Sequence, residues 1–281
     1  MSFSTLVDAA TLAAHLEDPD WVVCDVRHQL ADTAYGERVY AEGHIPGAVF
    51  LHCDRDLSGP MNGRNGRHPL PEVAAFCERM AALGINRSTQ VVAYDDSQGM
   101  ISGRLWWLLR ALGHQRVAVL DGGWQAWLTG HGAVDSRPST VEHSRYQGVS
   151  SFSGVVDAGE VLAHLESPAL CLVDARSPDR FRGENETIDP VGGHIPGARN
   201  RFFRDNLGID GRLKPAGVLR AEWLAVLAGA DPAAVVHQCG SGVSACLNQL
   251  AMEVAGLSGS RLYAGSWSEW CSDPVRPVAL N

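Results

Sequence analysis

The chain carries the same six residues, Gly-His-Ile-Pro-Gly-Ala, at 43–48 and again at 193–198. A second match lies upstream of each copy, where Asp-x-Arg stands at 25–27 and again at 174–176. A segment that recurs in this way marks the unit of folding. We therefore predict that the 281 residues form two copies of one domain.

Short apolar runs alternate with helical patterns in both copies, and Asp8 and Asp157 stand at matching positions where each is predicted to cap a helix. Parallel strands need long crossover connections, so this alternation predicts an α/β fold with a parallel sheet flanked by helices in each half. The predicted strands are 21–25, 90–94, 117–120, 170–174, 234–238 and 261–263, and the longer predicted helices are 71–83, 100–112, 219–228 and 243–254.

The predicted domain boundaries follow from one polar stretch. Residues 136–153 contain few apolar side chains, six Ser, two Arg and one Pro, which is typical of a linker. We predict a first domain at 1–135, a linker at 136–153 and a second domain at 154–281. Two domains also suit the length, because single cores stop growing at about 250–300 residues.

Composition and charge narrow the classes of partner and compartment. The net charge of −9 argues against binding to nucleic acid or to an anionic membrane surface. No run approaches the roughly 20 apolar residues that span a bilayer, and the polar start predicts a cytoplasmic protein. The seven cysteines are odd in number and lack tight spacing, which favours reduced thiols. Without a Cys-x-x-Cys or His-x-x-x-His pattern, we predict no metal site.

The sequence Cys-Gly-Ser-Gly-Val-Ser-Ala at 239–245 joins a predicted strand to a predicted helix. Such a loop directs backbone N–H groups and the positive end of the helix dipole toward its centre, which stabilises a thiolate. Gly240 and Gly242 let the backbone curl and leave the sulfur open. We predict that Cys239 is a nucleophile, and that the other six cysteines are packing residues because they lie outside such a loop.

The first half provides an internal comparison. Its matching loop, 94–102, is two residues longer and has Asp95 at the position of Cys239. It therefore has no nucleophilic sulfur. We expect the first domain to support the site and the second domain to perform the chemistry.

Together these features resemble the tandem-domain sulfurtransferases of the rhodanese family over nearly the whole chain. The resemblance also rests on Trp106-Trp107 and on Tyr-Ala-Gly-Ser-Trp-Ser-Glu-Trp at 263–270. It implies two rhodanese-like domains, the first non-catalytic and the second catalytic, with the active site at their interface. It further implies that no cofactor is needed and that sulfur is carried as a persulfide on Cys239.

The resemblance favours 3-mercaptopyruvate as the sulfur donor, with thiosulfate as the alternative, because thiosulfate-preferring members typically carry basic residues next to the cysteine. Arg180 matches the arginine that binds the donor carboxylate, and we expect it to do so bidentately. A second arginine usually precedes the Gly-His-Ile-Pro-Gly segment, but 184–190 contains none, which leaves Arg104 or Arg182 as substitutes. The predicted substrate-binding residues are Arg180, Gly240, Gly242, Val243 and Ser244.

The family resemblance also implies a proton relay to the leaving enolate. Its matching positions are Ser241, His44 and Asp32, which join Cys239 as predicted catalytic residues. The alternative is that His44 only anchors its turn by hydrogen bonds, as His194 must do at the repeated position.

Two other functions compete with sulfur transfer to a small acceptor. A cysteine-loop phosphatase needs an arginine six residues after the cysteine, and that position is Ala245. A non-enzymatic persulfide carrier that docks to a protein partner is compatible with the sequence. The expected acceptors are a thiol, cyanide or a thioredoxin-like protein, and steady-state turnover of free donor distinguishes an enzyme from a carrier.

Overall fold

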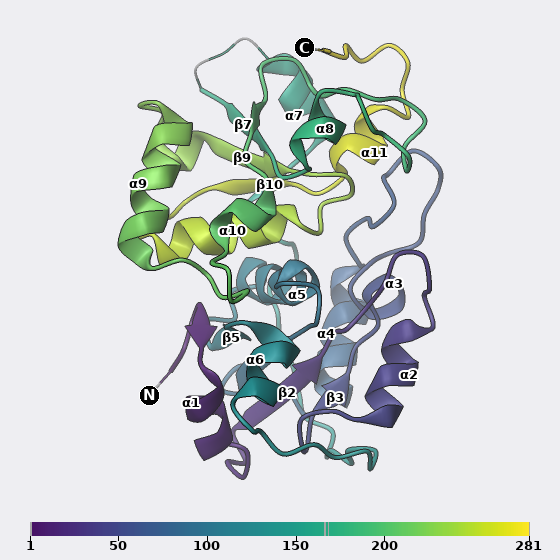
Figure 1. Ribbon diagram of the computed structural model, residues 1–281. Helices are drawn as coiled ribbons and strands as arrows, with labels where there is room; N and C mark the ends of the chain where they lie inside the picture. Colours follow the sequence, from purple (N-terminus) through teal and green to yellow (C-terminus); the bar gives the residue numbers. More distant parts are fainter. Residues whose placement is uncertain (1, 166, 168, 281) are drawn as a thin grey trace. The chain divides into compact units, whose positions relative to one another are not determined.

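The computed structural model describes residues 2–165, 167 and 169–280, which divide into two compact units (Figure 1). Unit 1 consists of Met1–Gly59, Pro71–Ser153 and Ile209–Arg212. Unit 2 consists of Pro60–Leu70, Gly154–Gly208 and Leu213–Asn281. No helix among the described residues is both long and apolar enough to cross a membrane.

The division of the chain differs from the predicted domain boundaries in two places. The junction after Ser153 coincides with the end of the predicted linker, but Pro60–Leu70 packs within unit 2 and Ile209–Arg212 within unit 1. The predicted linker itself is attached to unit 1, since the Ser139 hydroxyl donates to the carbonyl of Ala48 over 2.7 Å. The predicted end points Met1 and Asn281 lie outside the described residues.

Unit 1 is built on a five-stranded sheet in the order β1-β5-β4-β2-β3, and every strand pair in it is parallel. On one face, Leu12 and Trp127 pack against Val23 and Val92 of the two central strands. The elements are β1 (Leu6–Val7), α1 (Ala9–Ala14), β2 (Trp21–Asp25), α2 (Tyr35–Glu42), β3 (Val49–Phe50), α3 (Cys53–Asp56), α4 (Val73–Ala82), β4 (Gln90–Tyr94), α5 (Met100–Ala111), β5 (Val117–Leu120) and α6 (Gly123–Thr129).

Unit 2 repeats this topology with a sheet in the order β6-β10-β9-β7-β8, again parallel throughout. The elements are β6 (Val155–Val156), α7 (Ala158–Ala163), β7 (Cys171–Asp174), α8 (Pro178–Phe181), β8 (Arg199–Asn200), α9 (Ala216–Leu227), β9 (Val235–Gln238), α10 (Ala245–Val254), β10 (Arg261–Tyr263) and α11 (Ser266–Trp270), with 3-10 turns at Phe203–Asn206 and Pro232–Ala234.

The sheet of unit 2 is covered on both faces, as Figure 1 shows. Val173 and Val235 face one side, where they pack with Trp223 of α9 and with residues of α10. Leu172 and Val236 face the other side, where they pack with Trp267 of α11 and with residues of α7. Successive residues of a strand point to opposite faces, so a strand covered on both sides is apolar throughout.

The predicted strands and caps agree closely with the structure. Four of the six predicted strands have the observed bounds, and the other two begin one residue later. The carboxylates of Asp8 and Asp157 accept hydrogen bonds from the backbone N–H groups of Thr11 and Glu160 over 2.7 and 2.8 Å. The two-residue strands β1, β3, β6 and β8 were not predicted, because so short a segment has no periodicity.

The repeated motifs have the same structural function in both units. Arg27 pairs with Asp25 and donates a 2.7 Å hydrogen bond to the carbonyl of Gly43, the first residue of the repeated turn. Arg176 pairs with Asp174 and donates over 2.7 Å to the carbonyl of Gly193. The Asp-x-Arg pair therefore ties the end of a central strand to the Gly-His-Ile-Pro-Gly turn, which explains why both motifs recur together.

Candidate functional site

Cys239 lies at the carboxyl end of β9, directly before the loop that leads into α10. Ligands of open parallel sheets characteristically bind at this edge. The loop backbone is fixed by α11, because the N–H groups of Trp267 and Ser268 donate to the carbonyls of Cys239 and Gly240 over 3.0 and 2.9 Å. The N–H of Cys239 donates to Ser266 Oγ over 3.1 Å. The predicted nucleophile is therefore held in a fixed turn, with a residue exposure of 2%.

Two glycines shape this turn for different reasons. Gly242 has a φ of +75°, and a Cβ atom there would lie 2.2 Å from the carbonyl oxygen of Ala264. A Cβ atom at Gly240 would lie 2.8 Å from an Nη atom of Arg67, so the missing side chain gives this guanidinium access to the loop. Val243 is buried and Ser244 is half-buried at the start of α10. Substrate contact by these four residues stays a prediction.

Ser241 shares a 2.7 Å hydrogen bond with Nδ1 of His68. Both side chains are buried, and His68 belongs to Pro60–Leu70, the segment that packs within unit 2. A hydroxyl bonded to an imidazole can pass a proton in either direction. Ser241 is predicted from sequence as a catalytic residue, whereas His68 is not.

His44 and Asp32, the other two residues of the predicted proton relay, form hydrogen bonds and a ring contact within unit 1. Nδ1 of His44 hydrogen-bonds with the carbonyl of Tyr40 over 2.8 Å, and the imidazole stacks on the Tyr40 ring at 4.0 Å. His194 does the same with Phe181, at 2.9 and 3.8 Å. This symmetry supports the anchoring function of His44. Asp32 pairs with Arg38 over 2.8 Å, and this hydrogen bond lowers the pKa of its carboxyl.

Arg180 lies in the last turn of α8, close to Gly240 of the cysteine loop. Its guanidinium contacts two acidic side chains. Its Nε and Nη2 atoms hold the carboxylate of Glu186 at 2.9–3.0 Å, and Nη2 is 3.4 Å from Asp189. The Nη1 atom lies 3.8 Å from the position of a Cβ atom at Gly240. Glu186 thus occupies the Nε–Nη2 edge of Arg180, and bidentate binding of the donor carboxylate by Arg180 stays a prediction.

Arg67 is the second guanidinium at this loop, and it comes from the same segment as His68. Its Nη1 atom pairs with Asp189, and its backbone N–H donates to Ser268 Oγ over 3.1 Å. The two substitutes considered from sequence are engaged elsewhere. Arg104 is buried in unit 1 and donates to the carbonyl of Leu57 over 3.4 Å, and Arg182 is 41% exposed and pairs with Glu184.

In unit 1 the loop equivalent to the cysteine loop surrounds the carboxylate of Asp95. Its carboxylate accepts four backbone N–H hydrogen bonds of 2.8–3.0 Å and one from a serine hydroxyl at 3.1 Å. Burial raises the pKa of this carboxyl, while the hydrogen bonds act in the opposite direction. The turn is thus shaped to surround an anion, and in unit 1 the anion is part of the chain. The backbone donors are Ser97, Gly99, Ile101 and Ser102.

Replacing Asp95 with alanine is expected to destabilise the protein, because two buried and two part-buried backbone N–H groups lose their acceptor. Orphaned buried donors and broken buried charge contacts cost about 3 kcal/mol or more. For a chain of this size the melting temperature should fall by roughly 6–12 °C. Asp96→Ala is the matched control, since this exposed neighbour accepts a hydrogen bond from Tyr35 and should shift Tm by about 2 °C or less. Equal shifts in thermal unfolding for the two variants would contradict the anion-turn account.

One group of side chains in unit 1 has the composition of a metal site. His28, Cys53 and Asp54 bring ligand atoms within 4.8 Å of one another, and His28 Nε2 is 3.8 Å from Asp54. Burial raises the pKa of the Cys53 thiol to about 12. The absence of a metal requirement stays a prediction.

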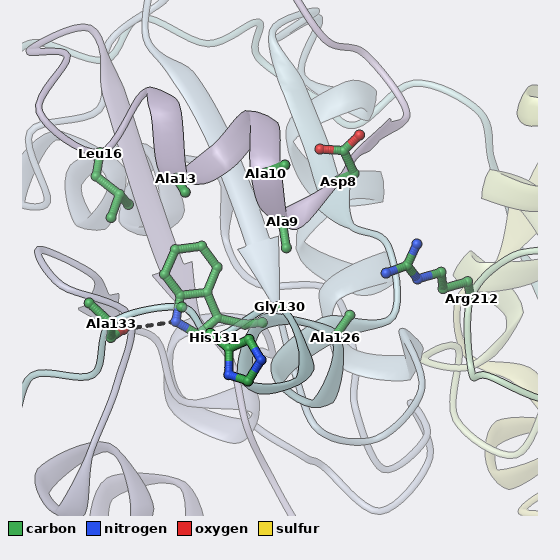
Figure 2. A pocket seen from close by; sticks show the side chains of 12 residues that line it. Asp8, Ala9, Ala10, Ala13, Leu16, Ala126, Gly130, His131, Ala133 and Arg212 are labelled. Carbon is green, nitrogen blue, oxygen red and sulfur yellow. Dashed lines mark hydrogen bonds between the residues drawn. The ribbon is translucent and has the colours of Figure 1, made fainter.

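Unit 1 also contains a hollow of about 540 Å³ between α1 and α6 (Figure 2). Its walls are mostly alanine and glycine together with Trp127, and Figure 2 shows Arg212 at one end. The Trp127 indole N–H donates to the carbonyl of Ala133 over 2.8 Å, so its polar atom is already satisfied. None of the predicted site residues lines this hollow.

The chain matches one family model twice. The model, described as a rhodanese-like domain, covers residues 8–129 and 157–273. The chain belongs to the rhodanese family. It has two rhodanese units in tandem, each with a parallel sheet between helices. The aspartate in the first rhodanese unit and the cysteine in the second occupy the same turn after the same strand.

Similar rhodanese proteins carry sulfurtransferase names. The chain is 48% identical to the "Probable 3-mercaptopyruvate sulfurtransferase" of Pseudomonas aeruginosa over 100% of both chains. It is 34% identical to the thiosulfate sulfurtransferase of Bos taurus, over 93% of this chain and 89% of that one. The structure of 3-mercaptopyruvate sulfurtransferase from Leishmania major superposes with a TM-score of 0.87 at 31% identity, covering 98% of this chain and 75% of that one.

Proposed function

We propose that this protein is a sulfurtransferase that moves sulfur from 3-mercaptopyruvate to a thiol or cyanide through a persulfide on Cys239. The observation that carries the proposal is the turn that holds Cys239, with the Ser241–His68 pair and two guanidinium groups around it. The names of the similar proteins support the same chemistry.

The turn suits a persulfide because the equivalent turn in unit 1 surrounds a carboxylate. Four backbone N–H groups hold the Asp95 carboxylate there, and both turns receive an N–H hydrogen bond from a tryptophan, Trp124 at 2.8 Å and Trp267 at 3.0 Å. Backbone N–H groups at a helix start stabilise thiolates and other anions. In unit 2 the same arrangement stabilises the Cys239 thiolate and then the terminal sulfur of the persulfide.

The first half-reaction forms an S–S bond and breaks a C–S bond. The Cys239 thiolate attacks the donor sulfur, and the electron pair of the C–S bond leaves with pyruvate as its enolate. The proton of the donor thiol passes to the enolate carbon through the Ser241 hydroxyl and His68, which gives pyruvate and a persulfide anion. An acceptor thiolate or cyanide then takes the terminal sulfur and restores the Cys239 thiolate.

Arg180 and Arg67 are placed to bind a sulfur donor that carries a carboxylate. Nη1 of Arg180 and an Nη atom of Arg67 flank Gly240, next to the nucleophile. The two N–H groups bind the donor carboxylate in place of the second arginine that the 184–190 segment lacks. The loop itself carries no basic residue, so thiosulfate, a smaller dianion, is the weaker donor.

The side-by-side comparison of kcat/KM for 3-mercaptopyruvate and thiosulfate tests this proposal. Arg180→Ala should lower kcat/KM for 3-mercaptopyruvate by about tenfold or more, because a lost charge-assisted hydrogen bond costs about 1.5–3 kcal/mol. Arg182→Ala is the matched control, since this arginine is exposed and pairs with Glu184. A higher kcat/KM for thiosulfate in the unaltered protein, or equal effects of the two variants, would refute the donor assignment.

Thiosulfate is the second candidate donor, because Arg67 adds a cation beside the loop that a dianion can use.

The second candidate function is a persulfide carrier that serves only a docked protein, such as a thioredoxin-like acceptor. A carrier of this kind should show little steady-state turnover with a small acceptor. We place the reaction in the cytoplasm, because seven cysteines without tight spacing are typical of reduced thiols in a reducing compartment.

A further inference from the structure

Asp189 occupies the space between the two guanidinium groups of the donor site. Its Oδ1 atom pairs with Arg67 and its Oδ2 atom lies 3.4 Å from Nη2 of Arg180. The side chain is 3% exposed, so the carboxylate is almost completely removed from water. A protein carboxylate thus contacts both groups that we assign to the donor carboxylate.

The position of Asp189 is fixed by the chain around it. The carboxylate of Glu186 accepts hydrogen bonds from the N–H groups of Ile188 and Asp189 over 2.9 and 3.0 Å, which folds the acidic segment into a tight turn. The same Glu186 carboxylate binds Arg180 and lies 3.5 Å from Arg176. The segment that lacks the expected arginine therefore supplies ordered negative charge instead.

Charge in this cluster is balanced. Three guanidinium groups, Arg67, Arg176 and Arg180, face three carboxylates. The carboxylates are Asp174, Glu186 and Asp189. Buried ion pairs add little net stability. A balanced cluster offers N–H donors to a donor molecule but no net attraction for a second negative charge.

We propose that Asp189 selects the sulfur donor by charge, cancelling the positive charge of Arg67 so that the site favours a monoanion over a dianion. This inference rests on the proposed function. 3-Mercaptopyruvate carries one negative charge, and thiosulfate carries two. Without the Asp189 charge the cluster has a net charge of about +1 beside the nucleophile, which stabilises the dianion more strongly.

The test is the ratio of kcat/KM for thiosulfate to kcat/KM for 3-mercaptopyruvate. Asp189→Asn keeps the shape and an acceptor oxygen but removes the charge, and should raise this ratio by about tenfold or more. Arg67→Gln removes the opposite charge and should lower the ratio by a similar factor. The double variant has the charge balance of the unaltered protein, so its ratio should return to within about threefold of it.

The matched control is Glu184→Gln, which removes one negative charge from the same segment. Glu184 is 56% exposed, and water and salt screen it, so the ratio should stay within about threefold. The thiosulfate kcat/KM of Asp189→Asn should also fall more steeply with added salt than that of the unaltered protein. A merely structural ion pair would change both donors alike.

Two results would overturn the inference: a ratio that Asp189→Asn leaves within about threefold, or a shift in the same direction for Asp189→Asn and Arg67→Gln. Intact-mass measurement of the unaltered protein after addition of 3-mercaptopyruvate separates this failure from failure of the proposed function. If the persulfide forms but the ratios do not respond to charge, only the assignment of Asp189 fails.

Discussion

Cys239→Ser is expected to reduce kcat/KM for 3-mercaptopyruvate by about 10⁴-fold or more, because loss of a covalent nucleophile removes the intermediate itself. Serine keeps the volume of the side chain and the backbone turn held by Trp267 and Ser268. The loss should therefore appear without a change in thermal stability. Initial rates of pyruvate release with a small thiol or cyanide as acceptor provide the measurement.

Cys271→Ser is the matched control for that variant. Cys271 lies in the same unit directly after α11, is half-buried, and burial raises its pKa to about 11, which keeps it a thiol at neutral pH. Its replacement should leave turnover within about threefold of the unaltered protein. Comparable losses in the two variants would exclude Cys239 as the sole sulfur carrier.

His68→Ala is expected to lower kcat with 3-mercaptopyruvate by about 10²–10⁴-fold, the range of general acid catalysis. His68 acts through Ser241, with which it shares a 2.7 Å hydrogen bond, so Ser241→Ala should produce the same defect. Thiosulfate should lose less than about tenfold, because sulfite leaves as a stable anion and needs no proton. Steady-state kcat for the two donors in each variant is the measurement.

The difference between donors distinguishes a proton relay from simple support of the loop. If His68 only held the cysteine turn in place, both donors would lose activity by the same factor. His44→Ala tests the histidine that was predicted from sequence as the relay residue. If His44→Ala lost activity only with 3-mercaptopyruvate, and His68→Ala did not, the assignment of the proton relay to His44 would be restored. We expect His44→Ala to affect both donors equally, through its Tyr40 contact.

The sheet and the cysteine turn could be predicted because their signals are local. Strand β4 is apolar from Val91 to Tyr94, between Gln90 and Asp95, and the turn at Cys239 has its glycines where the backbone needs them. The caps at Asp8 and Asp157 also depend only on neighbouring residues. The repeat strengthened each prediction, because one unit could be checked against the other.

The side chains that contact the cysteine turn could not be predicted, because they come from a segment that packs against residues far away in the sequence. Arg67 and His68 stand directly before the helix of unit 1 that begins at Val73, yet they pack within unit 2. No spacing or periodicity indicates such an exchange between units. The only sequence signal is a basic pair immediately before Pro-Leu-Pro at 69–71, where the prolines prevent a helix from starting earlier.

The sequence shows that the segment at 184–190 contains Glu184, Glu186 and Asp189 and lacks an arginine, but it does not indicate which cations these acidic residues bind. In the structure its carboxylates bind Arg180 and Arg67, which fixes the cations beside Gly240. The Arg67–Asp189 ion pair thus joins side chains that are 122 positions apart in the sequence. Pairings of this kind follow from tertiary structure and not from local propensity.

The persulfide at Cys239 can be tested by intact-mass measurement of the protein after addition of 3-mercaptopyruvate without an acceptor. We expect a gain of about 32 Da, one sulfur atom, which disappears when a thiol acceptor is added and never forms in Cys239→Ser. An unchanged mass in the unaltered protein, or the same adduct in Cys239→Ser, would contradict a persulfide at Cys239.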